Sequence, residues 1–156
     1  MRKFLLIVIF CLLILTGCKN NVNLNNSEIN NSNTQNTDIK ENEVEVSNLK
    51  VIINDKTYTL VLEKNNTVEE FINLLPQEFN MNELNGNEKY VYMDKSLTTN
   101  SFNPKQIKKG DVMLYGDNCL VIFYKSFETS YSYTKIGHID NLENLGNGSI
   151  IVKFEK

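Results

Sequence analysis

The side chains best suited to contacting a ligand in this sequence of 156 residues are tyrosines, most of which fall in its second half. A tyrosine ring offers an apolar face with a polar tip, which suits proline rings, sugars and planar ligands. Tyrosine is also common in β-strands for packing reasons alone, so a shared binding cleft and plain sheet packing both stay open. The residues predicted to bind a ligand are Tyr92, Tyr115, Phe123, Tyr131 and Tyr133.

Residues of the usual catalytic types are few and isolated. His138 is the only histidine, and no nucleophile accompanies it at a recognisable spacing. Cys119 begins an apolar run, which favours a buried thiol over a reactive one, and Asp111 after Gly110 is typical of a turn. One cysteine and one histidine do not give the ligand spacing of a zinc site. We therefore predict no catalytic residue, no metal site and no cofactor.

Charge and arginine content narrow the class of partner. The formal net charge is −3, and the only arginine is Arg2, close to the N-terminus. Arginine is the usual residue for bidentate recognition of phosphate and carboxylate, and nucleic-acid binding requires a basic surface. We expect no nucleic-acid partner and a low preference for phosphorylated or carboxylate ligands.

The N-terminus has the pattern of a lipoprotein signal peptide. Arg2 and Lys3 precede the apolar run 4–15, which is shorter than the roughly 20 residues that a membrane-spanning helix needs. Leu-Thr-Gly at 15–17 followed by Cys18 resembles the bacterial lipobox. The sequence thus predicts cleavage before Cys18 and attachment of lipid to it, which would anchor the protein to the outer side of the cell membrane. An uncleaved anchor and an ordinary secretory cleavage are the alternatives.

The chain divides into three parts by composition. Residues 1–17 are the predicted signal peptide. Residues 18–48 are predicted to be the lipidated cysteine and a disordered tether, because 19–48 is rich in asparagine and has no apolar periodicity. Glu41–Val46 alternate enough that an early strand is an alternative to a frayed entry. Residues 49–156 mix apolar and polar residues as one globular domain does.

Short strands dominate the predicted domain. Runs 49–53 and 56–62 flank Asn54-Asp55, which predicts a hairpin, and runs 112–115 and 119–124 predict a second. The run 119–124 is apolar on both faces, so we expect it to be central. Further strands are predicted at 79–81, 88–93, 131–139 and 149–154, with a long loop at 94–109.

Two helical segments are expected beside these strands. Thr67 with Glu70 three residues later fits a capping box, and Pro76 would stop that helix. Residues 141–145 suggest one further helical turn. Many short strands with one or two short helices indicate a small barrel or sandwich.

Three blocks, at 84–90, 110–124 and 129–139, resemble the cyclophilin-like fold proteins, a bacterial family divergent from true cyclophilins. The resemblance implies a mainly β domain, a small closed cyclophilin-like β-barrel with one or two short helices. True cyclophilins are peptidyl-prolyl isomerases whose chemistry relies on an arginine, and the predicted mature chain has none.

These observations lead to two hypotheses for the function. The first is a non-catalytic domain, displayed by the lipid anchor, that binds a peptide, a small ligand or an envelope protein. A deep apolar cleft beside Tyr115 would favour a prolyl or small-ligand site, whereas a flat polar face would favour a scaffold. The alternative is a divergent peptidyl-prolyl isomerase or foldase that acts on secreted proteins.

Overall fold

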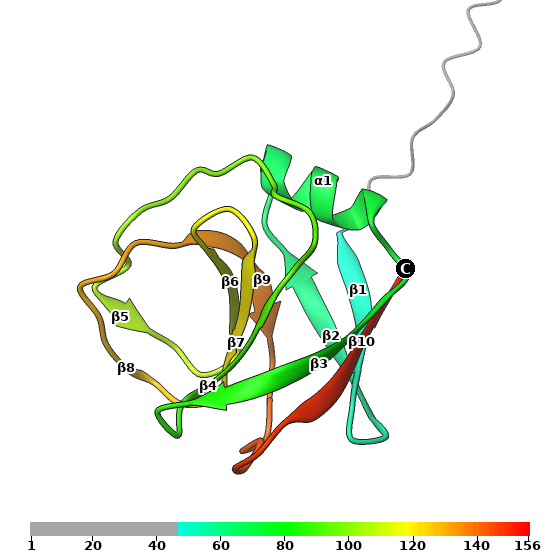
Figure 1. The fold of residues 1–156 in the computed structure, drawn as a ribbon, viewed down its shortest axis with the longest axis vertical. Helices are drawn as coiled ribbons and strands as arrows, with labels where there is room; N and C mark the ends of the chain where they lie inside the picture. Colours follow the sequence, from blue (N-terminus) through cyan, green and yellow to red (C-terminus); the bar gives the residue numbers. More distant parts are fainter. Residues whose placement is uncertain (1–46) are drawn as a thin grey trace, which may run out of the picture. The chain divides into compact units, whose positions relative to one another are not determined.

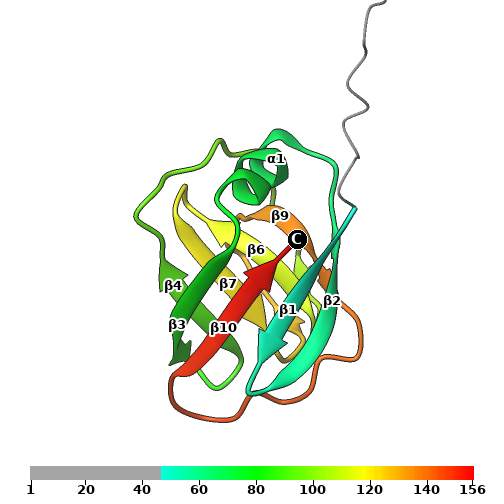
Figure 2. The same cartoon turned by 90° about the vertical axis from the view of Figure 1, so that its right-hand side faces the viewer.

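The strands of the domain close on themselves into a barrel. In the computed structural model, which describes residues 47–156, every neighbouring pair is antiparallel and the order is β1-β10-β3-β4-β7-β6-β9-β2, with β2 pairing back to β1 (Figures 1 and 2). The predicted mainly β closed barrel is confirmed. The barrel strands are β1 Asn48–Ile53, β2 Lys56–Leu62, β3 Gln77–Leu84, β4 Glu88–Tyr92, β6 Asp111–Tyr115, β7 Cys119–Phe123, β9 Thr134–Ile139 and β10 Ile150–Glu155.

Both predicted hairpins are present. Asn54 and Asp55 have φ of 48° and 65° between β1 and β2, as a two-residue turn of the primed type requires. The predicted loop 94–109 differs in one respect, because it contains the short strand β5 Gln106–Ile107. This strand pairs with β8 Phe127–Glu128 in a separate two-stranded sheet beside the barrel (Figure 1).

The helix begins at a different residue from the one predicted. The side chain of Asn65 caps α1, Asn66–Asn73, by accepting a hydrogen bond from the Val68 amide at 3.0 Å, so the predicted Thr67 cap is wrong. The Thr67 hydroxyl instead donates to the Thr98 carbonyl, and the Glu70 carboxylate accepts from the Thr98 amide. Both residues therefore attach the helix to the following loop. The buried face of α1 lies across one end of the barrel (Figure 2).

The second predicted helical turn is also wrong. A turn after β9 ends at Asn141, whose φ of 56° interrupts a helix, and residues 142–145 form an irregular loop. Leu142 and Leu145 are nevertheless buried in the core. Their apolar character reflects packing of a loop, so the described residues contain one short helix.

Strand β7 explains why a run can be apolar on both faces. Leu120 and Ile122 belong to the main core that fills the barrel, whereas Cys119, Val121 and Phe123 belong to a second cluster. Alternation along the strand places this second set on the outer face. Ile107 of β5 and Tyr133 of the loop before β9 cover that face, so the barrel wall is apolar on both sides at this point.

Features predicted from the N-terminal sequence lie outside the described residues. These are the signal peptide 1–17, the lipid site Cys18, the early strand at 41–46 and the tether up to residue 46. Between residues 47 and 156 no helix is both long and apolar enough to cross a membrane.

One surface ion cluster ties the last strand to the first. Glu155 pairs with Lys50, its cross-strand neighbour, and with Lys153 at 2.5 Å, and these contacts lower the pKa of Glu155 to about 2. A carboxyl group with a lowered folded-state pKa stabilises the fold above its unfolded pKa, and this contribution is lost as the pH falls through about 2.

We therefore expect the Glu155→Gln variant to be slightly less stable than the wild type at pH 7, since exposed pairs contribute little. The two proteins should converge in stability near pH 2. Urea unfolding at both pH values measures the difference, and a gap that stays constant across the range would contradict the assignment.

Candidate functional site

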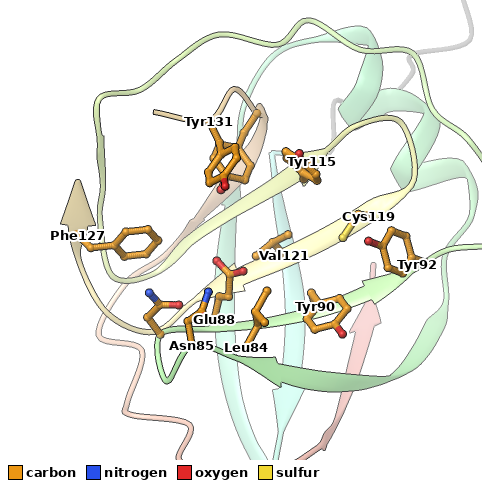
Figure 3. Close-up of a pocket in the computed structure, with 12 residues that line it drawn as sticks. Leu84, Asn85, Glu88, Tyr90, Tyr92, Tyr115, Cys119, Val121, Phe127 and Tyr131 are labelled. Carbon is orange, nitrogen blue, oxygen red and sulfur yellow. The ribbon is translucent and has the colours of Figure 1, made fainter. Parts of the chain in front are cut away.

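A pocket of about 330 Å³ opens on the outer face of the barrel wall beside Tyr115 (Figure 3). Strands β4, β6 and β7, the turn between β3 and β4, and the loop before β9 all contribute to its lining. This volume is at the lower end of the range of small-ligand sites. The structure thus has a cavity beside Tyr115, where the sequence had left a shared cleft and plain sheet packing both open.

The pairing of the strands places the aromatic side chains in rows. Tyr92 on β4 and Tyr115 on β6 are both register partners of Cys119 on β7, so these three side chains lie side by side on one face. In the next row, Tyr90 is the partner of Val121. Two tyrosine-bearing strands therefore flank a floor of small apolar side chains.

The loop before β9 forms the side of the pocket across from β4. The rings of Tyr115 and Tyr131 lie 6.0 Å apart, edge to face, and Tyr133 lies 5.6 Å from Tyr115. Tyr133 is buried, whereas Tyr92 and Tyr131 are 65% and 61% exposed. Of the large apolar side chains exposed between residues 47 and 156, the majority line this pocket: Leu84, Tyr92, Tyr115 and Tyr131. Such clustering is typical of a binding surface.

Four of the five predicted ligand residues line the pocket, and Phe123 does not. Phe123 is fully buried, and its ring packs against Tyr133 at 5.5 Å and Phe127 at 5.7 Å. Its place is behind the pocket wall, where it supports the rings that face the cavity.

Glu88 is a pocket residue that the sequence analysis missed. It begins β4, and the two-residue period of a strand places it on the same face as Tyr90 and Tyr92. Figure 3 shows its carboxylate directed into the space between the tyrosines of β4 and those of the loop. Burial, and secondarily the negative charge of Glu83, raises the pKa of Glu88. In the sequence, the two-residue spacing of Glu88, Tyr90 and Tyr92 was the sign that Glu88 lies on the same face as the tyrosines.

A second polar group lies at the same end of the pocket. Asn87, next to Glu88 in the turn between β3 and β4, also lines the cavity, and its Oδ1 atom is buried without a hydrogen-bond partner. A buried acceptor of this kind is uncommon in folded proteins. The pocket therefore has an aromatic side and a polar end formed by Glu88 and Asn87.

Cys119 lies in the floor of the pocket and is buried, with 5% of the residue exposed. Burial raises the pKa of this thiol, and the nearby Glu88 carboxylate acts in the same direction. Both effects favour the neutral thiol over the thiolate that nucleophilic chemistry needs. In this site Cys119 acts as a small apolar side chain.

His138 and Asp111 lie together but do not line the pocket. His138 Nδ1 is 3.0 Å from Asp111 Oδ1, and Asp111 Oδ2 accepts from the Lys108 amide at 2.8 Å across the turn before β6. Asp111 therefore stabilises the turn through one carboxylate oxygen and contacts the His138 ring through the other. Within residues 47–156 no group of three potential metal ligands occurs.

Comparison with known proteins identifies a family. No curated protein and no solved structure gave a significant match. A family model described as the Cyclophilin-like family matches residues 51–155, which is more than half of the chain and nearly all of the described barrel. The chain therefore belongs to the cyclophilin-like family.

Proposed function

We propose that this protein is a membrane-anchored, extracytoplasmic lipoprotein whose cyclophilin-like barrel binds a peptide or a small ligand without catalysing a reaction. The pocket beside Tyr115 is the observation that carries this proposal. It combines a concave shape, exposed aromatic rings and a few polar groups, which are the usual components of a ligand site. Its one thiol is buried, and its surroundings favour the neutral form.

The anchoring part of the proposal is supported by the sequence around Cys18. An apolar segment of signal-peptide length followed directly by a lipobox-like tetrapeptide suits lipid attachment at that cysteine. Mass spectrometry of the purified protein tests it, because cleavage before Cys18 and acylation change the mass of the N-terminal peptide by known amounts. A mature N-terminus elsewhere would contradict it.

The binding function is tested by NMR on the isotope-labelled full chain in an uncharged maltoside detergent. The probe is the capped tetrapeptide acetyl-Ala-Lys-Pro-Phe-amide, and both the amide shifts of the protein and the cis–trans exchange of the peptide are recorded. We expect shifts at the pocket without faster exchange. Uncatalysed prolyl exchange takes tens of seconds or more, so catalysis would be evident. Accelerated exchange would replace this proposal by the isomerase alternative.

Three conservative variants locate the bound peptide. Removing one hydroxyl in Tyr115→Phe, Tyr131→Phe or Tyr133→Phe should weaken binding by about threefold to tenfold, the value of one hydrogen bond. The matched control is Tyr58→Phe, because Tyr58 packs against the main core and does not line the pocket. Unchanged affinity in all three pocket variants would exclude this site.

A further inference from the structure

We infer that the group recognised by this pocket is a compact organic cation, an alkylammonium, which the Glu88 carboxylate holds between the tyrosine rings. This inference rests on the proposed binding function and narrows its ligand. The shared chemistry occurs both in free small amines and in the side chain of a lysine within a peptide.

No cationic side chain of the described residues pairs with the Glu88 carboxylate. Within residues 47–156 it has no hydrogen-bond or ion-pair partner, and no lysine or histidine of this part of the chain lines the pocket. Lys125, on the nearby loop, places its Nζ 5.9 Å from the ring of Tyr124 and is not a lining residue. The negative charge at this end of the pocket is therefore available to a ligand.

Burial makes the ionised form of the Glu88 carboxylate unfavourable. Removing a carboxylate from water is unfavourable unless a partner compensates it, and burial raises the pKa of Glu88 accordingly. The charge of Glu88 also raises the pKa of Tyr133 on the opposite wall, after burial. A bound cation would relieve this penalty, whereas a carboxylate or phosphate ligand would increase it.

Two pairs of tyrosine rings line the same pocket as the Glu88 carboxylate. Tyr90 and Tyr92 pack edge to face at 6.0 Å on one side, and Tyr115 and Tyr131 do so at 6.0 Å on the other. Edge-to-face pairs turn ring faces in two perpendicular directions. The electron-rich face of a tyrosine ring attracts an ammonium group, most strongly where water is excluded. In Figure 3 the Glu88 carboxylate lies beside Val121 and points toward the ring of Tyr131, with Tyr90 farther along β4.

The donors of an ammonium group match the acceptors at the polar end of the pocket. An ammonium group carries N–H or polarised C–H groups and no acceptor, whereas the Glu88 carboxylate at the polar end of the pocket has acceptors only. The volume of about 330 Å³ accommodates a small amine or one lysine side chain.

The test compares ligands that differ only in charge, again by NMR titration of the full chain in maltoside detergent. Phosphocholine detergents are avoided because they carry a quaternary ammonium. Choline is paired with its neutral isostere 3,3-dimethylbutan-1-ol. The lysine tetrapeptide is paired with the same peptide containing norleucine. We expect each cationic probe to bind at least about tenfold more tightly than its neutral match, and the tighter of the two cations identifies the source.

Two variants assign the effect to residues. Glu88→Gln should weaken both cations by about tenfold or more and leave the neutral probes unchanged. Tyr131→Leu keeps apolar volume but removes a ring face, and should weaken choline by about threefold. Glu78→Gln, on an exposed position of β3 outside the pocket, is the control for net charge. Because the ionised Glu88 carries a burial penalty, Glu88→Gln should keep or raise the melting temperature at pH 7.

The outcomes separate the two proposals. Equal binding of charged and neutral probes at the pocket would overturn the cation inference and leave the binding function in place. If neither cation moves the pocket amides, the inference fails and the proposed function loses its site as well. Cation binding that survives Glu88→Gln would also overturn the inference, because the carboxylate would then not be the partner.

Discussion

Replacing Gly137 by alanine should destabilise the barrel by about 3 kcal/mol, as overpacking of a well-packed interior does. Gly137 lies on β9 opposite Leu62 of β2, at the pair of strands that closes the barrel. A Cβ atom there would overlap the backbone carbonyl oxygen of Val61 and come within 2.8 Å of Leu60 Cδ1. The carbonyl is part of the backbone, so only a movement of the strands would make room.

Urea unfolding of the wild type and the Gly137→Ala variant measures this effect. The matched control is Gly116→Ala in the turn between β6 and β7, where the added Cβ would meet no atom within 4 Å. Gly116 has a φ of +62°, so the control includes the cost of a left-handed alanine, about 1 kcal/mol. A loss at Gly137 no larger than that at Gly116 would show that β2 and β9 separate easily.

The strands could be predicted because their pattern is local. The hairpin around Asn54-Asp55 and the strand Cys119–Phe123 follow from turn residues and apolar runs within a few positions. The closed barrel required the family resemblance, because the pairings of β2 with β9 and of β3 with β10 join distant parts of the sequence. No periodicity within one segment specifies such partners.

Local sequence patterns predicted the wrong structure at the start of the helix and in the segment 141–145. Asn65, Asn66 and Thr67 are all residues that cap helices, and the choice of Asn65 depends on the separate engagement of Thr67 by the Thr98 carbonyl. Leu142 and Leu145 have the spacing of a helix, but a positive φ at Asn141 turns the chain before a helix can form. Tertiary contacts decided both cases.

The candidate site was predictable in its aromatic half only. The tyrosines were recognisable by residue type, whereas the packing of Tyr131 and Tyr133 against Tyr115 is seen only in the structure. Glu88 looked like an ordinary first residue of a strand. Its importance depends on burial beside a second carboxylate and on a row of neighbours from other strands, none of which the sequence displays.

The same alternation that directs Glu88 outward directs Lys89 into the protein. Lys89 is fully buried, and its Nζ donates to the carbonyl oxygens of Gly146 and Gly148, each at 2.7 Å. The ammonium also lies 5.3 Å from the centre of the Tyr124 ring, and burial lowers the pKa of Lys89. One side chain thus fixes the loop before β10 and the start of β4, the segment that carries the pocket carboxylate.

Lys89→Ala should therefore destabilise the domain by about 4 kcal/mol, from lost charge-assisted hydrogen bonds and from a cavity. Lys89→Met keeps most of the buried stem, so we expect about half of that loss. Lys56→Met, the matched control in an exposed ion pair, should leave stability nearly unchanged. Urea unfolding measures all three.

In the methionine variant, faster amide hydrogen exchange should be confined to the start of β4 and the loop at 146–149, because those segments lose the hydrogen bonds that join them. If exchange there stays as slow as in the wild type while stability falls, Lys89 acts only by filling volume, and the position of Glu88 does not depend on it.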